Sequence, residues 1–297
     1  MTDKARLDGK VALVTGAGGG IGRAIAIEFA RAGADVAIAE VIPERCEEAA
    51  ARVRELGRKA LGCVVDMMAA EAILELVNRV DAEFGRIDIL VNNAGGTSCR
   101  PFLQQNETNW KRIIDLNLMS MLRATHAVAP IMIREGRGGA IINVASIEAQ
   151  RAAPFFAVYA ACKAGMVNFT KTMALELAEY GIRVNAMAPD HTVSPGSRGN
   201  RSGPVDESKW FTHTPVEAEA MRQLVPIGRQ GVDAECGDAA VFLASAMSAY
   251  ITGVVLPVDG GTSASSGWLR LPEGGWTLNQ GLRIAPLPDP NRGKPPK

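Results

Sequence analysis

The segment YAACK places Tyr159 four residues before Lys163, in a stretch with helical patterning. Side chains four residues apart share one face of a helix, so the phenol and the ammonium group are expected to be neighbours. A phenol with its ordinary pKa of about 10 is a slow acid or base at neutral pH. An ammonium group about 4 Å away contributes about 4 kcal/mol at an effective dielectric constant of 20, and about 1.4 kcal/mol corresponds to one pKa unit. The pair therefore predicts a tyrosine prepared for proton transfer.

A serine is placed to work with this pair. Ser146 lies thirteen residues before Tyr159 and directly follows the apolar run AIINVA. Its hydroxyl is suited to hydrogen-bond a substrate oxygen and to hold that oxygen against the phenol. A YxxxK spacing occurs often by chance, and a surface tyrosine beside a solvated lysine is the alternative interpretation. The serine, together with the glycine-rich turn described next, favours a catalytic group.

The first apolar run is followed by TGAGGGIGR, in which the glycines have the spacing TGxxxGxG. Glycine suits such a turn because it adopts unusual dihedral angles and lets the backbone approach a pyrophosphate closely. The helix that follows directs free N–H groups and a partial positive charge at this anion. A plain flexible turn is the alternative, but the turn predicts a dinucleotide site.

Glu40 ends the second apolar run, 18 residues after Gly22. An acid about 20 residues beyond the glycines of a dinucleotide site binds the adenosine ribose hydroxyls and repels a 2′-phosphate. The next residue is Val41, so no arginine follows directly to pair with such a phosphate. NAD is therefore predicted in preference to NADP, unless Glu40 is only a solvated strand end.

Composition narrows the class of protein. The 297 residues are 47% hydrophobic and carry 32 basic and 32 acidic side chains, which is typical of a globular chain and argues against a nucleic-acid or anionic-membrane partner. The first residues lack the apolar core of a signal peptide, and no apolar run approaches the about 18 residues of a membrane helix. Five scattered cysteines without a CxxC pair predict free thiols in the cytoplasm. The three histidines are not paired at helical spacing, so no metal site is predicted.

Short apolar runs alternate with longer amphipathic segments along the chain. The runs are rich in Val and Ile, as strands buried on both faces are, which predicts a parallel sheet covered by helices. A β-α-β order with right-handed crossovers gives a doubly wound, Rossmann-like α/β sheet of about seven strands in a single domain. Ligands bind outside the carboxyl ends of such strands. The predicted strands are 10–16, 35–40, 60–66, 87–93, 140–146, 182–189 and 254–260, and the predicted helices are 20–32, 43–57, 69–84, 106–135, 155–180 and 233–246.

From about Leu7 to Gly261, the chain resembles the short-chain dehydrogenases/reductases. The resemblance is carried by TGAGGGIG, NNAG at 92–95, Asn117 within DLNL, Ser146 and YAACK, which match in type and order. It implies a dehydrogenase domain over 1–261 in which Tyr159 is the acid/base and Ser146 orients the substrate. It also implies that Lys163 lowers the pKa of the tyrosine and binds the nicotinamide ribose.

The resemblance implies further roles. Asn117 would hold a water that links Lys163 to solvent, although read alone it is a polar residue inside a helix with no evident purpose. Asp66 would lie beside the adenine and Thr192 near the carboxamide. The implied catalytic residues are Ser146, Tyr159, Lys163 and Asn117. The implied cofactor-binding residues are Gly16, Gly19, Gly20, Ile21, Gly22, Glu40, Asp66, Asn93, Ala94, Gly95, Tyr159, Lys163, Pro189 and Thr192.

The family places a variable substrate lid after the sixth strand, here at about 194–225, around the polar stretch 194–214. Apolar side chains of the lid and of neighbouring loops are predicted to cover a bulky apolar substrate. For each aromatic residue, the alternative is that its side chain packs within the lid itself. The extension 262–297 is predicted to pack on a surface at first, across a subunit interface or elsewhere, and to be disordered at its Pro-rich end. The predicted substrate residues are Glu148, Gln150, Phe155, Trp210 and Phe211, with Phe102, Phe156 and Met221 nearby.

The predicted function is NAD(H)-dependent interconversion of a secondary alcohol and a ketone on a steroid-like, 3-hydroxyacyl/3-oxoacyl or similar hydrophobic substrate. One alternative is an NAD-bound epimerase or dehydratase with the same fold. Another is a dinucleotide-binding protein with the same fold and no catalytic activity. The resemblance also implies a homotetramer or homodimer.

Asp190 departs from the family pattern, because glycine usually follows the strand-ending proline that is here Pro189. Three interpretations remain open for this carboxylate. It is a turn residue, since Asp tolerates left-handed dihedral angles, or a catalytic acid, or a charge that stabilises the cationic oxidised nicotinamide.

Overall fold

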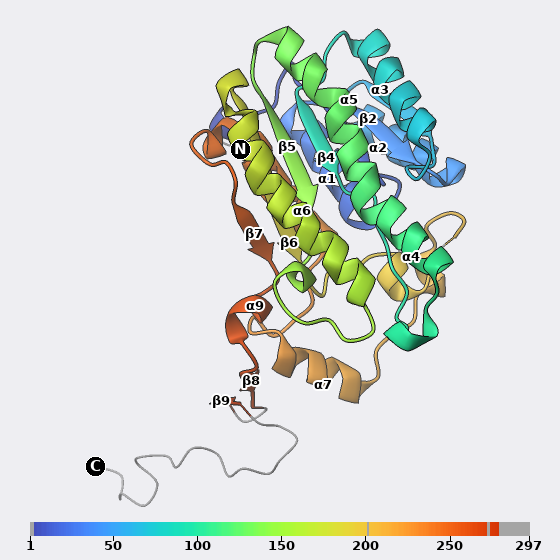
Figure 1. Cartoon of the computed structure of the whole chain (residues 1–297). Helices are drawn as coiled ribbons and strands as arrows, with labels where there is room; N and C mark the ends of the chain where they lie inside the picture. Colours follow the sequence, from blue (N-terminus) through green and yellow to red (C-terminus); the bar gives the residue numbers. More distant parts are fainter. Residues whose placement is uncertain (1–2, 201, 272–273, 279–297) are drawn as a thin grey trace, which may run out of the picture.

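Seven parallel strands form one sheet at the centre of the molecule, in the order β3-β2-β1-β4-β5-β6-β7 (Figure 1). The computed structural model describes residues 3–200, 202–271 and 274–278. The strand order reverses between β1 and β4, and ligand sites of doubly wound sheets lie at this point. The strands are β1 Val11–Thr15, β2 Asp35–Glu40, β3 Ala60–Val64, β4 Ile89–Asn92, β5 Gly139–Val144, β6 Ile182–Pro189 and β7 Val255–Val258.

Helices cover both faces of the sheet. Helices α1, α2 and α8 pack on one face, and α3, α5 and α6 pack on the other (Figure 1). The carboxyl ends of the strands point toward α4, α7 and α9, which gather at one end of the molecule (Figure 1). The helices are α1 Gly20–Ala32, α2 Pro43–Glu55, α3 Ala70–Phe84, α4 Glu107–Ile114, α5 Ser120–Glu135, α6 Ala157–Glu176, α7 Pro215–Leu224, α8 Asp233–Ala244 and α9 Thr262–Ser265.

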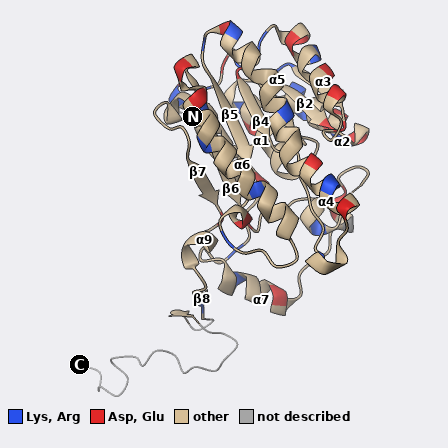
Figure 2. Ribbon diagram, in the orientation of Figure 1, with Lys and Arg blue, Asp and Glu red and all other residues tan. Residues whose placement is uncertain are grey.

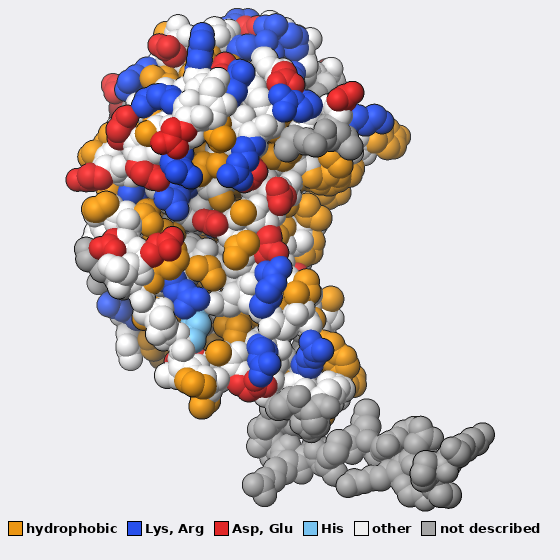
Figure 3. All heavy atoms as spheres, turned by 180° about the vertical axis from the view of Figure 1, so that it is seen from behind, with side chains coloured by type: hydrophobic (Ala, Val, Ile, Leu, Met, Phe, Trp, Pro, Cys, Tyr) orange, Lys and Arg blue, Asp and Glu red, His pale blue; other side chains and the backbone are white. Residues whose placement is uncertain are grey.

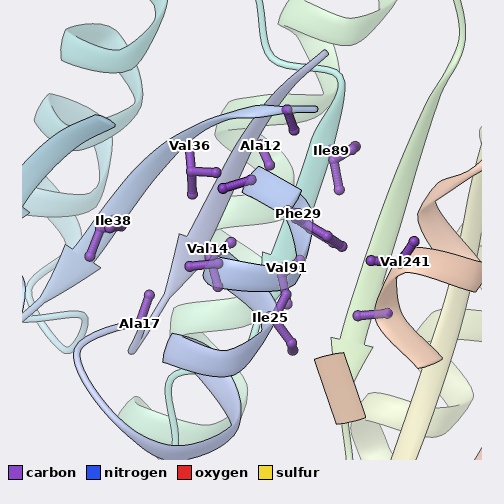
Figure 4. Packing of buried hydrophobic residues seen from close by; sticks show 14 of the residues in the cluster. Ala12, Val14, Ala17, Ile25, Phe29, Val36, Ile38, Ile89, Val91 and Val241 are labelled. Atoms are coloured by element: carbon purple, nitrogen blue, oxygen red, sulfur yellow. The ribbon is translucent and has the colours of Figure 1, made fainter. Parts of the chain in front are cut away.

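The core explains why the strands carry continuous apolar runs. Ile25 and Phe29, one helical turn apart on α1, pack against Val14 and Val91 of neighbouring strands and lie near Val241 of α8 (Figure 4). Every residue of β1 is buried, because helices cover it on both sides. Burial of one such side chain contributes about 1.5–3 kcal/mol, so this core holds the strand ends that carry the site in place.

The predicted seven-stranded doubly wound sheet is confirmed, while some elements differ from the prediction. The helix predicted over 106–135 is divided into α4 and α5 by a π-helical turn at Asp115–Met119. Helix α7 was not predicted, although Thr214 and Glu217 form a capping box at its start and Pro215 occupies its first turn. The polar, Gly-rich stretch before this helix is typical of a loop, so the capping box was not interpreted as the start of a helix.

The segment after β7 continues into α9 and a two-stranded antiparallel ribbon, β8 Leu269–Arg270 and β9 Trp276–Thr277. Strand β8 contacts α7, so the start of the extension packs beside the lid. Trp276 is 45% exposed on this ribbon. The Pro-rich end that was predicted to be disordered lies outside the described residues, and packing across a subunit interface stays a prediction.

Acidic and basic side chains are interspersed over the surface. Figure 2 shows both signs side by side on α3 and α4, and the view from behind in Figure 3 shows the same mixing. Within the described ranges, no helix has the length and apolar character needed to span a membrane.

Candidate active site

The glycine-rich turn joins β1 to α1 and is clamped by the segment after β4. A Cβ atom on Gly22 would lie 2.2 Å from the carbonyl oxygen of Gly16, so only glycine fits there. The Asn93 side-chain amide donates to the carbonyl oxygens of Thr15 (2.9 Å) and Gly16 (3.0 Å). The Thr15 hydroxyl accepts from the backbone N–H groups of Asn93 and Ala94, both at 3.0 Å. Thr15 thus positions both motifs, a role that the sequence did not reveal.

Glu40 is built into the same turn. Its carboxylate accepts hydrogen bonds from the backbone N–H groups of Gly18 (3.0 Å), Val41 (3.0 Å) and Ile42 (3.1 Å). The residue is only 9% exposed, so it is not a solvated strand end. Oε1 accepts two of these bonds and Oε2 one, and an ionised carboxylate has about four acceptor positions. The carboxylate therefore retains capacity for a ligand hydroxyl.

A cavity of about 610 Å³ extends from this turn to Tyr159 and Lys163. Its shape suits a dinucleotide, because the glycine turn and the start of α1 lie at one end and the tyrosine and lysine at the other. Thr192 and Pro189 do not line it, and Thr192 lines a separate cavity of about 310 Å³ instead. The predicted cofactor residues that line the larger cavity are Gly16, Gly19, Gly20, Ile21, Gly22, Glu40, Asp66, Asn93, Ala94, Gly95, Tyr159 and Lys163.

Ser146, Tyr159 and Lys163 meet at the ends of β5 and α6. Ser146 caps the 3₁₀ turn Ile147–Ala149 that directly follows β5, and it forms a hydrogen bond with Tyr159. The Lys163 ammonium lies 5.6 Å from the centre of the Tyr159 ring. It is buried and donates to the carbonyl oxygen of Val144 at 2.7 Å. The three side chains expected to act together are therefore adjacent.

The pKa values in this group run opposite to the expectation. Burial in the cavity wall raises the pKa of Tyr159 above its ordinary value; the Ser146 hydrogen bond opposes this rise, and the carboxylates of Glu148 and Asp190 add to it. Burial lowers the pKa of Lys163 to about 8. The expectation that Lys163 sets a low tyrosine pKa is thus not met in this structure, because a buried ammonium group is itself destabilised and donates to a carbonyl.

The π-helical turn gives Asn117 its position. Its side-chain amide donates to the carbonyl oxygens of Gly96 (2.8 Å) and Ile113 (2.9 Å), and its Oδ1 accepts from Gly96 N–H (3.0 Å). A Cβ atom on Gly95 would lie 2.9 Å from Asn117 Oδ1 and 3.5 Å from Lys163 Nζ. The two side chains therefore converge on Gly95. An extra residue in a helix is a common device at functional sites, and no periodicity in the sequence signals it.

Asp190 does not adopt the left-handed conformation proposed for a turn residue. The left-handed residue is its neighbour His191, with φ of 42°. The Asp190 carboxylate lies 3.4 Å from an Arg151 guanidinium nitrogen and 3.2 Å from His191 Nε2. The same Arg151 donates to Glu148 at 2.8 Å. Burial raises the pKa of Asp190, while His191 and Arg151 oppose the rise. A small charged cluster that sequence reasoning did not foresee thus lies beside Tyr159.

Three of the predicted substrate residues lie on the loops around the start of α6. Phe155 is 53% exposed and its carbonyl oxygen accepts from Arg100 N–H at 3.2 Å, which brings the loop containing Phe102 alongside. Phe102 stacks on Trp110 with ring centres 5.3 Å apart. Glu148 has one buried carboxylate oxygen without a hydrogen-bond partner among the described residues, whereas Gln150 is exposed.

Phe211 packs within the lid. The Phe211 ring lies 5.6 Å from the His213 ring and 5.7 Å from the Arg198 guanidinium, both from the lid itself. Neither Trp210 nor Phe211 lines the large cavity. Of the two interpretations given for the lid aromatics, the contacts of Phe211 favour packing within the lid.

Comparison with known proteins agrees with this geometry. The model of the short chain dehydrogenase family matches residues 10–203. The chain is similar to the 3-oxoacyl-[acyl-carrier-protein] reductase FabG of Thermotoga maritima, with 37% identity over 257 residues, which are 86% of this chain and 98% of that protein.

Solved structures are similar over the same extent. The complex of a 7α-hydroxysteroid dehydrogenase with NADH and 7-oxo glycochenodeoxycholic acid has a TM-score of 0.80 at 34% identity, covering 87% of this chain and 96% of that one. A gluconate 5-dehydrogenase from Burkholderia cenocepacia, in complex with NADP and tartrate, has a TM-score of 0.79 at 34% identity, covering 88% and 98%. The chain therefore belongs to the short-chain dehydrogenases/reductases, a family of nicotinamide-dinucleotide oxidoreductases that act on CH–OH groups.

Proposed function

We propose that the protein interconverts a secondary alcohol and a ketone with NAD(H), using Tyr159 as the acid/base. The observation that carries the proposal is the meeting of Ser146, Tyr159 and Lys163 at one end of the cavity that begins at the glycine turn. The nicotinamide cofactor supplies or accepts the hydride. The residues of the chain orient the substrate and move its proton.

Ser146 holds the substrate oxygen, and Tyr159 gives a proton to that oxygen in reduction or removes it in oxidation. The Ser146 hydroxyl lies close enough to the phenol to lower its pKa, so a carbonyl oxygen that binds beside both hydroxyls can accept a hydrogen bond from each. Lys163 keeps a positive charge beside the phenol below its pKa of about 8. Asn117 is bonded to the backbone of Gly96 and lies with Lys163 around Gly95, where it would order a water molecule for proton exchange.

The substrate is a hydrophobic alcohol or ketone of steroid-like or 3-hydroxyacyl/3-oxoacyl type. Two exposed aromatic rings support this class, Phe102 in the turn before α4 and Phe155 in the loop before α6. Two similar proteins, a 3-oxoacyl-[acyl-carrier-protein] reductase and a 7α-hydroxysteroid dehydrogenase, support it as well. The test is a screen of steroids, acyl thioesters and simple secondary alcohols with NAD⁺, and of the matching ketones with NADH, followed at 340 nm. Turnover of small hydrophilic alcohols alone would contradict the substrate class, and absence of any turnover would contradict the reaction.

The cofactor is NAD in preference to NADP, because the buried Glu40 carboxylate accepts ribose hydroxyls and repels a 2′-phosphate. NADH is expected to raise the melting temperature more than NADPH at equal concentration. Glu40→Gln removes the charge, but its NH2 group replaces one accepting oxygen and so loses a backbone hydrogen bond of the turn. The variant should shift the ratio of NADPH to NADH dissociation constants by about tenfold toward NADPH. Glu44→Gln, an exposed neighbour, is the matched control. Larger stabilisation of the wild type by NADPH would refute the assignment.

Asp190 favours the oxidised cofactor. Its carboxylate lies in the charged cluster close enough to Tyr159 to raise the pKa of the phenol, at the strand end where the family binds the nicotinamide. Asp190→Gly is expected to weaken NAD⁺ binding relative to NADH by several-fold, and to lower the pKa seen in the pH profile of alcohol oxidation. Isothermal titration with both cofactor forms measures the ratio. An unchanged ratio of NAD⁺ to NADH affinity would contradict this proposal, and Asp190 would then only hold the ion-pair cluster together.

The protein assembles as a homotetramer or homodimer. An apolar groove of about 730 Å³ on the outer side of α3, α5 and α6, lined by Leu74, Leu122, Phe169 and Met173 among others, supports this arrangement. All five cysteines are unpaired, which fits a reducing compartment such as the cytoplasm.

A further inference from the structure

Arg45 lies in the first turn of α2 and is only 8% exposed. Arginine is rarely buried without a partner, since its guanidinium group is always charged and strongly hydrated. None of the described carboxylates lies within ion-pair distance of it. Its burial therefore requires other acceptors.

These acceptors are two main-chain carbonyl oxygens of the lid. Arg45 Nε donates to Gly203 O at 2.6 Å, and Nη2 donates to Asn200 O at 2.9 Å. Hydrogen bonds from a charged donor are about twice as strong as neutral ones. The partners lie more than 150 residues further along the chain, so the two bonds join separate parts of the fold.

The lid segment that Arg45 holds is organised around Asn200, itself only 8% exposed. The Asn200 side chain donates to the carbonyl oxygens of Ser202 (3.1 Å) and Pro204 (3.2 Å) and accepts from Asp206 N–H (2.8 Å). Its backbone N–H donates to Pro195 O at 2.8 Å. One asparagine thus gathers both ends of the segment, and Arg45 binds the segment at this point.

The same segment lies on the glycine turn. A Cβ atom on Gly20 would lie 2.9 Å from Ser194 Cβ, and one on Gly19 would lie 3.5 Å from Pro195 Cγ and 3.6 Å from Arg45 Nη1. Ser194 and Pro195 line the cavity of about 610 Å³ between the glycine turn and Tyr159, together with Glu40 and Arg45. The lid therefore contributes to the wall around the pyrophosphate and adenosine end of the cofactor site.

We infer that Arg45 is a positioning residue that fastens the lid at Asn200 and Gly203 across the adenosine end of the cofactor site, so that cofactor affinity depends on this guanidinium. The inference rests on the proposed cofactor assignment. Without the two hydrogen bonds, the lid samples open arrangements, and the dinucleotide must order it on binding. The cost appears as a weaker dissociation constant and a higher KM for the cofactor.

The test compares Arg45→Met with Arg52→Met, an exposed arginine on the same helix that pairs with Glu55. NADH fluorescence titration should give a dissociation constant about tenfold higher for Arg45→Met and unchanged for Arg52→Met. Trypsin should cut after Arg198 faster in Arg45→Met without NADH, and saturating NADH should restore protection. Equal NADH affinity in Arg45→Met and wild type, even with a lower melting temperature, would overturn the inference.

Two further variants cover the case in which Arg45→Met does not fold. Arg45→Lys retains the charge but cannot bind both carbonyl groups with the same geometry, so an intermediate affinity is expected. Asn200→Ala leaves Arg45 intact but removes the centre of the lid segment, and should raise the NADH dissociation constant in the same way. Wild-type affinity in both would refute the inference alone, whereas absence of NADH binding by the wild type would refute the cofactor assignment and the inference with it.

Discussion

Replacement of Tyr159 by phenylalanine is expected to lower kcat by about 10³-fold in both directions while leaving NADH affinity nearly unchanged. Acid–base catalysis by a positioned group contributes about 10²–10⁴-fold, and the phenol hydroxyl is the group that contacts the substrate oxygen in the proposed reaction. The substitution deletes one oxygen atom and keeps the ring that packs beside Lys163. Steady-state kinetics on the best substrate from the screen measures the effect.

The pH profile adds a second readout. The pKa of Tyr159 is raised, so the phenol stays protonated to higher pH than an ordinary tyrosine. Alcohol oxidation by the wild type should therefore rise with pH through the alkaline range, because it needs the ionised phenol, and ketone reduction should not. The Phe variant should lose this rise. Tyr180→Phe, at a tyrosine 42% exposed and remote from the cavity, is the control and should behave as wild type. Full activity of Tyr159→Phe would exclude the acid/base assignment.

Replacement of Lys163 by methionine is expected to make the protein more stable and at least about 10²-fold less active. The pKa of Lys163 falls from 10.5 to about 8 on burial, which corresponds to about 3 kcal/mol of destabilisation at pH 7. Methionine fills a similar volume without a charge, and loss of the bond to Val144 O costs about 1 kcal/mol. A net gain of about 2 kcal/mol raises the melting temperature by about 5 °C. Activity falls because the variant lacks the ammonium group that would bind the nicotinamide ribose in the proposed reaction.

The pH dependence of this gain follows from linkage. Between about pH 8 and 10.5, the folded protein holds fewer protons on Lys163 than the unfolded chain does. The destabilisation by Lys163 is therefore complete below pH 8 and fades as the pH rises to 10.5, where both states carry a neutral amine. The difference in melting temperature between Lys163→Met and wild type should shrink over the same window. Lys171→Met, on the exposed side of α6, is the control. A variant less stable than wild type at pH 7 would contradict the argument.

Much of the fold was predictable because its signals are local. Each buried strand of a parallel sheet needs apolar residues on both faces, so runs such as VALVT and DVAIAE indicate strands without reference to the rest of the chain. Helix α7 escaped prediction even though its capping box is equally local. The polar, Gly-rich stretch before it resembles a loop, and only its packing beside β8 shows that it belongs to the folded body.

The sequence by itself determined the chemistry of this protein and the end of the sheet where it lies. Ser146 follows the end of one strand, Tyr159 and Lys163 share the next helix, and Glu40 and the glycine turn lie at the ends of neighbouring strands. Residue type and short-range spacing suffice for these assignments, because parallel strands bring their carboxyl ends to one edge.

Only the tertiary structure decided the pKa values of the site residues and the contacts that hold them in place. The raised pKa of Tyr159, the lowered pKa of Lys163 and the ion pairs of Asp190 arise from burial and from contacts between distant segments. Arg45 bonds to Gly203 across 158 positions, and no local pattern encodes such a pairing. Desolvation and long-range hydrogen bonds exist only after folding, so the electrostatics of the site and the fastening of its lid became visible only in the folded molecule.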